Sequence, residues 1–164
     1  MNAVMKRPLP RRFTHVPGNK LWWRNMQGSP TKYVKEGGKR EFAIEIPDYL
    51  AEELECDGWT CISHKRKSSL DPDSPIISRM KIKINFDARV PPRIYIAGED
   101  ENQKTLVDES YLDEQNIDSR RIAWVNIDIN PYVRDTSCTA YLSEMTIKFD
   151  GDIVEYSYGD NVDF

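Results

Sequence analysis

Apolar and polar side chains alternate along several short stretches of this chain, and the clearest stretch covers residues 79–86. Met80, Ile82, Ile84 and Phe86 occupy its even positions, while basic or amide side chains occupy the odd positions. Side chains of a β-strand point alternately to the two faces of a sheet. The alternation therefore predicts a half-buried strand with one apolar and one basic face.

Residues 40–46 and 123–129 show the same alternation and are also predicted to be strands. Pro131 follows the second of them. We expect it to end that strand, because proline has no backbone N–H to donate to a neighbouring strand. Less regular apolar or aromatic stretches predict further strands at residues 21–26, 59–63, 93–97 and 140–149.

One short helix is predicted between these strands, over residues 48–54. Pro47 is suited to a helix start, and Leu50 and Leu54 lie on one helical face. Gly58 is suited to the position just after a helix end.

Six or seven strands with one helix, and no repeated strand–helix units, predict a mainly β protein. Its length fits an antiparallel barrel of five or more strands, and we expect a fold like the oligonucleotide/oligosaccharide-binding (OB) barrel, with flexible termini. Three prolines and five basic residues within residues 1–20 indicate a flexible basic arm. Residues 21–149 then form the barrel domain, and residues 150–164 form an acidic tail.

The charge of the chain is divided between its two ends. The first 40 residues contain ten Lys or Arg and a single acid, Glu36, whereas the last fifteen contain five carboxylates and no Lys or Arg. The overall net charge of -4 hides this separation. Because an acidic segment can compete with a polyanion for a basic surface, the pattern indicates a nucleic-acid partner.

Several classes of protein are not expected from this sequence. No apolar run approaches the roughly 20 residues of a membrane span, so we expect no membrane partner. The cysteines are Cys56, Cys61 and Cys138, and neither their spacing nor that of His15 and His64 fits a metal site. We predict reduced thiols in a cytoplasmic protein, with no cofactor and no metal. Residue order suggests no grouping of nucleophile, base and acid, so we do not expect an enzyme.

The basic face of the strand at 79–86 is the first candidate for ligand binding. It carries Arg79, Lys81 and Lys83 at alternate positions. Lysine on an outer strand can simply prevent aggregation between sheet edges, which is the structural alternative. The functional interpretation is a positively charged track for the phosphates of a single strand.

Aromatic side chains near cations are the second candidate, because proteins that bind single strands stack bases on exposed rings. A consecutive pair such as Trp22 and Trp23 cannot both face the core of a sheet, and Trp124 falls on the polar side of its strand. Tyr33 lies in a basic loop with two glycines. Half-buried core positions are the alternative for each ring. The predicted nucleic-acid-binding residues are Trp22, Trp23, Arg24, Lys32, Tyr33, Lys35, Lys39, Arg40, Arg79, Lys81, Lys83 and Trp124.

The tip of the acidic tail is the third candidate, through Asp160, Asp163 and Phe164. An acidic end can serve solubility alone. An aromatic ring contributes nothing to solubility, however, and we predict that it anchors in an apolar pocket with a basic rim on another protein.

Several short segments, taken in order along the chain, resemble a known family. They are Arg24-Asn25-Met26 with Gly28, Gly38-Lys39-Arg40-Glu41-Phe42-Ala43-Ile44, Asp57-Gly58-Trp59, Pro91-Pro92-Arg93-Ile94-Tyr95, Lys104-Thr105-Leu106-Val107-Asp108 and Ala140-Tyr141-Leu142. From residue 24 to about residue 153, the chain resembles bacteriophage-encoded single-stranded DNA-binding proteins with an OB-fold. The ending Asp163-Phe164 is similar to that of podophage replication proteins, whose acidic tail contacts the phage polymerase and helicase.

The resemblance implies a non-enzymatic homodimer that binds a displaced strand during DNA replication and recombination in the host cytoplasm. Our leading hypothesis is therefore a protein that binds single-stranded DNA without sequence preference and recruits replication or recombination proteins through its tail. The alternative is a phage structural or host-interaction protein that uses the same barrel for protein contacts.

Overall fold

In the computed structural model, which describes residues 8–30, 37–100 and 102–151, nine strands form a single sheet. The strands are β1 Arg11–Pro17, β2 Leu21–Asn25, β3 Arg40–Ile46, β4 Ile62–Arg66, β5 Ile76–Ile84, β6 Arg93–Ala97, β7 Lys104–Val107, β8 Ile122–Arg134 and β9 Ser137–Phe149. The helices are α1 Asp48–Asp57 and α2 Glu109–Glu114, with short 3-10 turns η1 Gly18–Lys20 and η2 Ile117–Ser119.

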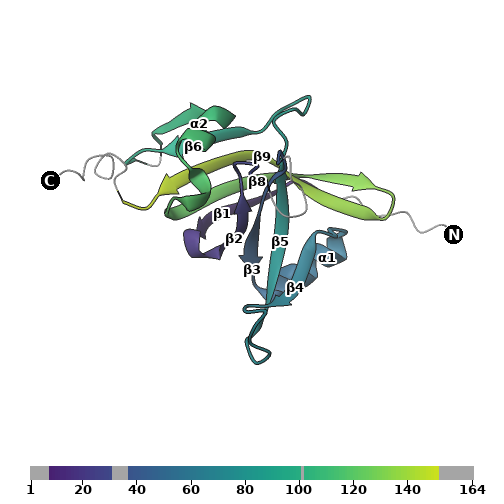
Figure 1. Ribbon diagram of the computed structural model, residues 1–164. Helices are drawn as coiled ribbons and strands as arrows, with labels where there is room; N and C mark the ends of the chain where they lie inside the picture. Colours follow the sequence, from purple (N-terminus) through teal and green to yellow (C-terminus); the bar gives the residue numbers. More distant parts are fainter. Residues whose placement is uncertain (1–7, 31–36, 101, 152–164) are drawn as a thin grey trace.

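The strand order of the sheet is β1-β8-β9-β5-β3-β2, with β4 beside β5 and the β6–β7 pair beside β9 (Figure 1). β1 and β2 stand at opposite ends of this order, yet only η1 separates them in the chain. Together they act as one bent first strand, which pairs with β8 along its first half and with β3 along its second. The sheet thus curls into a partly open barrel of the OB type, which confirms the mainly β, OB-like prediction.

Two pairings of β9 are parallel, one with β5 and one with β6, so the sheet is mixed and not antiparallel throughout. Parallel neighbours need a crossover connection, and the long segment between β5 and β9 supplies it. The alternation of apolar and polar residues could not distinguish parallel from antiparallel pairing. Side chains point to the two faces of a sheet with the same period in both.

The inward-facing side chains of the barrel strands form one apolar core. Ile44 of β3 and Ile82 of β5 are buried in it, as their alternation predicts. Ala51 and Leu54 of α1 belong to the same core. Asp48, at the start of α1, accepts a hydrogen bond of 2.9 Å from the hydroxyl of Ser78. The helix is therefore fixed against β5 by both apolar and polar contacts.

The helix predicted over residues 48–54 is confirmed and continues to Asp57. Gly58 follows it with a φ of 114°, a left-handed conformation that a Cβ atom disfavours. Gly18 in η1 is needed for a different reason. A Cβ atom there would overlap the carbonyl oxygen of Ile122, so glycine allows η1 to lie directly on the start of β8.

The prediction of a flexible arm over residues 1–20 is wrong for residues 11–20, which form β1 and η1. The register of β1 with β8 shifts between Phe13 and Val16, and His15 has a φ of 50°. Such a bulge interrupts the alternation by which a strand is identified. The first seven residues of the predicted arm lie outside the described residues.

The prediction that Pro131 ends its strand is also wrong, because β8 continues to Arg134. β1 pairs with β8 only as far as Ile129, so at Pro131 the neighbour of β8 among the described strands is β9 alone. Proline is tolerated where one edge of a strand is free. Beyond this point β8 and β9 form a hairpin that extends away from the rest of the sheet (Figure 1).

Candidate nucleic-acid interface

Two consecutive indoles meet on the same side of the sheet, which a regular strand would not allow. The register of β2 with β3 shifts between Trp22 and Asn25, and Trp23 has a φ of 50°. This bulge turns Trp23 to the side on which Trp22 already lies. Both rings contact Arg79 of β5, whose guanidinium carbon lies 4.0 Å from the ring centroid of Trp22 and 4.6 Å from that of Trp23. The guanidinium is thus held by cation–π contacts with two indoles.

Arg79, Lys81 and Lys83 alternate with core residues along β5 and share one side of the sheet, which we call the outer face. The alternation thus identifies their common face correctly, but not their exposure. Lys81 is exposed and Lys83 is half-buried, whereas Arg79 is only 1% exposed. Because the indoles of Trp22 and Trp23 lie over it, Arg79 is not an open part of a cationic track.

The polar atoms of Arg79 are poorly matched by its surroundings. Its Nε and Nη1 atoms have no hydrogen-bond partner among the described residues. Glu45 lies opposite Arg79 on β3, but its carboxylate accepts instead from Lys20 Nζ at 2.8 Å and from Trp22 Nε1 at 3.0 Å. Burial lowers the pKa of the Arg79 guanidinium, while the charge of Glu45 acts in the opposite direction. Arginine stays protonated at neutral pH in proteins, so Arg79 is a buried cation.

Glu45 supplies the balancing negative charge. Its burial acts to raise the pKa of its carboxyl, but hydrogen bonds from Lys20 and Trp22 and the charges of Lys20 and Arg79 outweigh this, and the pKa lies below its ordinary value. Glu45 is therefore ionised at neutral pH. The single negative charge of Glu45 balances only one of the two positive charges of Lys20 and Arg79. These three side chains together therefore keep a net positive charge.

Trp23 is the exposed ring of the pair, with 48% of its surface open to solvent. Lys65 of β4 lies close to it, with its Nζ atom 5.6 Å from the ring centroid. Trp22 is half-buried and fixed by its hydrogen bond to Glu45. An exposed flat ring beside cations has the two features that stacking of a base and contact with a phosphate require.

Tyr141 of β9 extends the outer face beyond Lys83, its neighbour in the parallel β5–β9 pair. Tyr132 of β8 is 52% exposed and contacts Tyr141 edge to face, with ring centroids 5.8 Å apart. A groove of about 910 Å³ begins beside Tyr141, and Asn85 and Arg93 are among its lining residues. Exposed aromatic rings therefore lie near both ends of the lysine pair on β5.

The sequence analysis missed Tyr141, because alternation along residues 140–149 puts it on the same face as Met145. The register of β8 with β9 shifts between Asp128 and Ile129. This bulge leaves Met145 in the core and turns Tyr141 outward.

Lys65 and Tyr132 were missed for other reasons. Lys65 belongs to a stretch whose composition predicts a loop, and it reaches Trp23 only because β4 pairs with β5. Tyr132 follows Pro131, where the strand was predicted to end. The residues around Lys65 and Tyr132 in the sequence do not indicate their roles. These roles depend on pairing between strands that are distant in the chain.

Arg24, a predicted nucleic-acid-binding residue, lies away from the outer face. Its Nη1 atom donates to the carbonyl oxygen of Arg120 at 2.9 Å and to that of Ile117 at 3.4 Å. The side chain is half-buried, and burial lowers the pKa of its guanidinium. Arg24 thus joins β2 to η2 within the fold.

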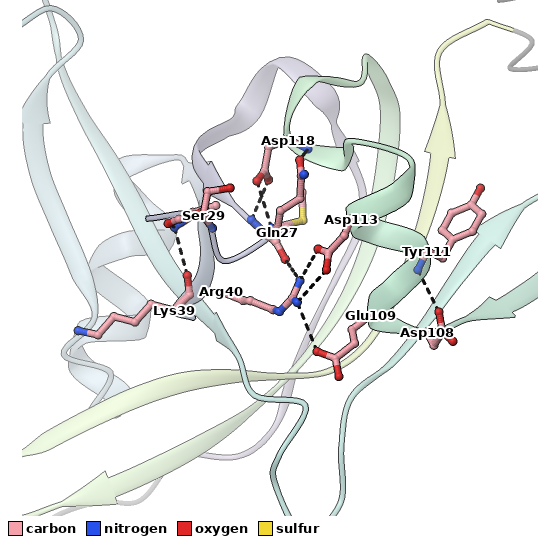
Figure 2. A network of polar contacts seen from close by, with 11 residues as sticks. Gln27, Ser29, Lys39, Arg40, Asp108, Glu109, Tyr111, Asp113 and Asp118 are labelled. Atoms are coloured by element: carbon pink, nitrogen blue, oxygen red, sulfur yellow. Dashed lines mark hydrogen bonds and ion pairs between the residues drawn. The ribbon is translucent and has the colours of Figure 1, made fainter. Parts of the chain in front are cut away.

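Arg40 is likewise used within the fold, as Figure 2 shows. Its guanidinium donates to the carbonyl oxygen of Met26 at 2.8 Å and to carboxylates of α2, at 3.0 Å from Asp113 and 3.3 Å from Glu109. It also lies 5.4 Å from the ring centroid of Phe86. Arg40 therefore ties β3 and the β2–β3 connection to α2.

Trp124 lies on β8, on a different part of the sheet from the tryptophan pair of β2. It stacks on His15 of β1, with ring centroids 4.5 Å apart, and it pairs with Lys148 of β9. Its partner on the other neighbouring strand is Pro17 of β1, so Trp124 lies on the β1–β8 side of the barrel and the tryptophan pair on the β2–β3 side. The structure therefore brings Trp22 and Trp23 together with Arg79, but not Trp124.

Lys39 is exposed at the start of β3. The other predicted residues of its loop (Lys32, Tyr33 and Lys35) and the tail residues (Asp160, Asp163 and Phe164) lie outside the described residues. Their roles stay predictions.

No group of three or more His, Cys, Asp or Glu side chains in the part of the chain that the structure describes could hold a metal ion. None of the described helices is long and apolar enough to cross a membrane.

The sequence matches the model of a family described as "Putative phage ssDNA-binding domain" over residues 4–163. Because the match spans nearly the whole chain, the protein belongs to this family of phage single-stranded DNA-binding domains. The family resemblance predicted from the sequence is thereby confirmed. No curated protein sequence matches the chain.

Solved structures of similar shape come from bacteriophage Enc34. The chain is similar to its single-stranded DNA-binding protein in complex with ssDNA, with a TM-score of 0.51, 11% sequence identity and coverage of 93% of this chain and 95% of that chain. The C-terminal truncation of that protein gives a TM-score of 0.48 at 11% identity, with 93% and 95% of the two chains covered. A further structure of the Enc34 single-stranded DNA-binding protein also gives a TM-score of 0.48 at 11% identity, with 99% of this chain and 94% of that chain covered. The likeness to the first of these structures supports a shared fold.

Proposed function

We propose that this protein binds single-stranded DNA without sequence preference, through the outer face of β3 and β5. The observation that carries the proposal is the exposed indole of Trp23, held beside Arg79 and Lys65 on that face. Membership of the phage ssDNA-binding domain family supports it. OB-type barrels bind oligonucleotides on the face of their second and third strands. In this barrel those strands are β3 and β5, when β1 and β2 are counted as one and β4, which lies off the main strand order, is left out.

Each part of the outer face has a distinct role in this proposal. Trp23 stacks on a base, and stacking tolerates any sequence because every base has a flat face. Lys65, Lys81 and Lys83 contact phosphates of the backbone. Tyr141 offers a second ring where the face continues onto β9. Lys81 Nζ lies 3.6 Å from Oε2 of Glu41. A phosphate that binds Lys81 therefore replaces this ion pair.

The wider role is part of the same proposal. The protein coats displaced strands during phage DNA replication and recombination in the host cytoplasm, as a homodimer without catalytic activity. Lys32, Tyr33, Lys35 and Lys39 in the β2–β3 connection clamp the strand, and the tip of the tail recruits partner enzymes. The family match and the charge division along the sequence support this role.

Intrinsic tryptophan fluorescence, titrated with oligothymidine of about 15 nucleotides, tests the binding function. Stacking on Trp23 should quench the emission, and added salt should reverse the quenching because phosphate contacts release counterions. A phage structural or host-interaction protein would show neither quenching nor salt dependence.

Deletion of residues 152–164 tests the tail. It keeps Asp150, whose backbone N–H donates to the carbonyl oxygen of Arg121 at 3.0 Å. If the tail competes with DNA for the basic face, the deletion should tighten oligothymidine binding several-fold at low salt, and the difference should vanish at high salt. A matched variant carries Asp152→Asn, Glu155→Gln, Asp160→Asn and Asp163→Asn in the full-length chain. It should bind like the deletion, whereas unchanged or weaker binding by both variants would contradict the competition.

A further inference from the structure

We propose that a phosphate-binding site lies beneath Trp23, in which the unmatched N–H groups of Arg79 donate to a phosphate of the bound strand once the indole moves aside. The inference rests on the proposed function and assigns a ligand to a residue that is closed to solvent in the free protein. Three observations carry it: the donors without an acceptor, the exposed ring of Trp23 beside them, and the charge around them.

The donors of Arg79 are not satisfied by the carboxylate that lies opposite on β3. Both oxygens of Glu45 accept hydrogen bonds, but from Lys20 and Trp22. Nε and Nη1 of Arg79 have no acceptor among the described residues, although the side chain is 1% exposed. A buried donor without an acceptor disfavours the fold, and such groups occur where a ligand completes the hydrogen bonding.

Trp23 is the ring that can move. It is nearly half exposed, and its backbone has a positive φ that a bulky residue rarely adopts. Strain of this kind is concentrated at functional sites. Trp22, in contrast, is anchored by its hydrogen bond to Glu45. When Trp23 swings away, Arg79 keeps one stacking partner, and the released indole is free to stack on a base of the same strand.

The charge around Arg79 favours a phosphate over a neutral acceptor. Lys20, Lys65 and Arg79 lie around the tryptophan pair, and Glu45 is the carboxylate that pairs with Lys20 and lies opposite Arg79. The two indoles hold the guanidinium by cation–π contacts, and these contacts leave its Nε and Nη1 donors unused. Guanidinium edges match the oxygens of a phosphate in geometry and in charge.

The variant Arg79→Met tests the site. Met fills the space between the indoles and makes favourable contacts with aromatic rings, and Glu45 keeps its bonds to Lys20 and Trp22. Replacing a poorly paired buried ion by an apolar side chain is often neutral or stabilising. We therefore expect an equal or higher Tm, at least a tenfold loss of oligothymidine affinity, and a salt slope shallower by about 0.7, the contribution of one phosphate of a single strand. Arg79→Lys, which keeps the charge, should retain most of that slope.

An abasic oligonucleotide, which has the phosphates but no bases, identifies the group that Arg79 contacts. Arg79→Met should weaken binding of the abasic strand and of oligothymidine by similar factors. A loss confined to oligothymidine would overturn the phosphate assignment in favour of a base.

Two other results would also overturn the inference. A clear fall in Tm for Arg79→Met would assign Arg79 to the fold. Unchanged affinity and salt slope would leave the proposed function intact, provided that wild-type protein binds oligothymidine, and would remove Arg79 from the binding site. Absence of wild-type binding would refute the proposed function itself, and the inference with it.

Discussion

Arg40 and Arg79 are both predicted to bind DNA and both lie largely inside the protein, yet their surroundings differ. Arg40 donates to the carbonyl oxygen of Met26 and to two carboxylates of α2 (Figure 2). Arg79 contacts two aromatic rings, while two of its nitrogens have no acceptor among the described residues. Burial is common to both arginines, and hydrogen bonding separates them.

The comparison shows how a structural arginine differs from one available to a ligand. A guanidinium that donates hydrogen bonds to groups inside the protein would lose those bonds on turning to DNA. Arg40 is therefore best suited to stabilising the fold. A guanidinium with open donors gains bonds when a ligand arrives. The sequence alone does not distinguish the two arginines, because both occur in basic stretches.

Arg40→Met should have the largest effect, and the effect should fall on stability. The variant leaves the carbonyl of Met26 and the carboxylates of Asp113 and Glu109 without their shared donor. Hydrogen bonds to charged groups contribute about 1.5–3 kcal/mol. We expect the free energy of unfolding to fall by about 3 kcal/mol in urea titrations, mostly through the buried carbonyl, since both carboxylates are about half exposed.

Arg79→Met is the matched control, because it makes the same substitution at an arginine that is buried even more deeply. It should leave the free energy of unfolding unchanged or raise it. Equal losses of stability in the two variants would show that the comparison between the arginines is mistaken.

Trp23→Ala should have the next largest effect, on DNA affinity. Stacking of one base contributes about 1–3 kcal/mol, so we expect a loss of roughly 30-fold in oligothymidine binding, measured by fluorescence anisotropy of a labelled strand. Trp124→Ala is the control, because Trp124 stacks on His15 and lies on β8, which in the described sheet does not pair with β3 or β5, and its loss should leave affinity unchanged. A larger loss for Trp124 than for Trp23 would move the binding surface to β1 and β8.

Removal of single lysines should have the smallest effect. Lys81→Met and Lys83→Met should each make the slope of log K against log salt less negative by about 0.7. Lys104→Met is the control, because Lys104 lies over the ring of Tyr95 and belongs to β7, which among the described strands pairs with β6 and not with β3 or β5. If all three variants keep the wild-type slope, phosphates do not pass along β5.

The sequence predicted the parts of the fold that depend on local pattern. Regular alternation identified β3 and β5, and glycine after a polar run marked the end of α1. The misses have a common cause, since bulges at His15, Trp23 and the middle of the β8–β9 pair break the period of two. A bulge depends on the partner strand as much as on the residue, so a single sequence does not reveal it.

The same reason limits what the sequence could say of the candidate site. Alternation correctly put Arg79, Lys81 and Lys83 on one face. It could not show that the backbone at Trp23 would bring a second indole over Arg79, or that β4 would supply Lys65. The rings and the cations were thus identifiable by type and charge, whereas their grouping required the strand pairings.

The central claim is that a single strand of DNA lies on the outer face, at Trp22 and Trp23. The indole N–H signals of the four tryptophans in isotope-labelled protein, followed by NMR during titration with oligothymidine, test this claim most directly. We expect the signals of Trp22 and Trp23 to shift, while those of buried Trp59 and of Trp124, which stacks on His15, stay in place. A shift of the Trp124 signal, with Trp22 and Trp23 unmoved, would contradict the account.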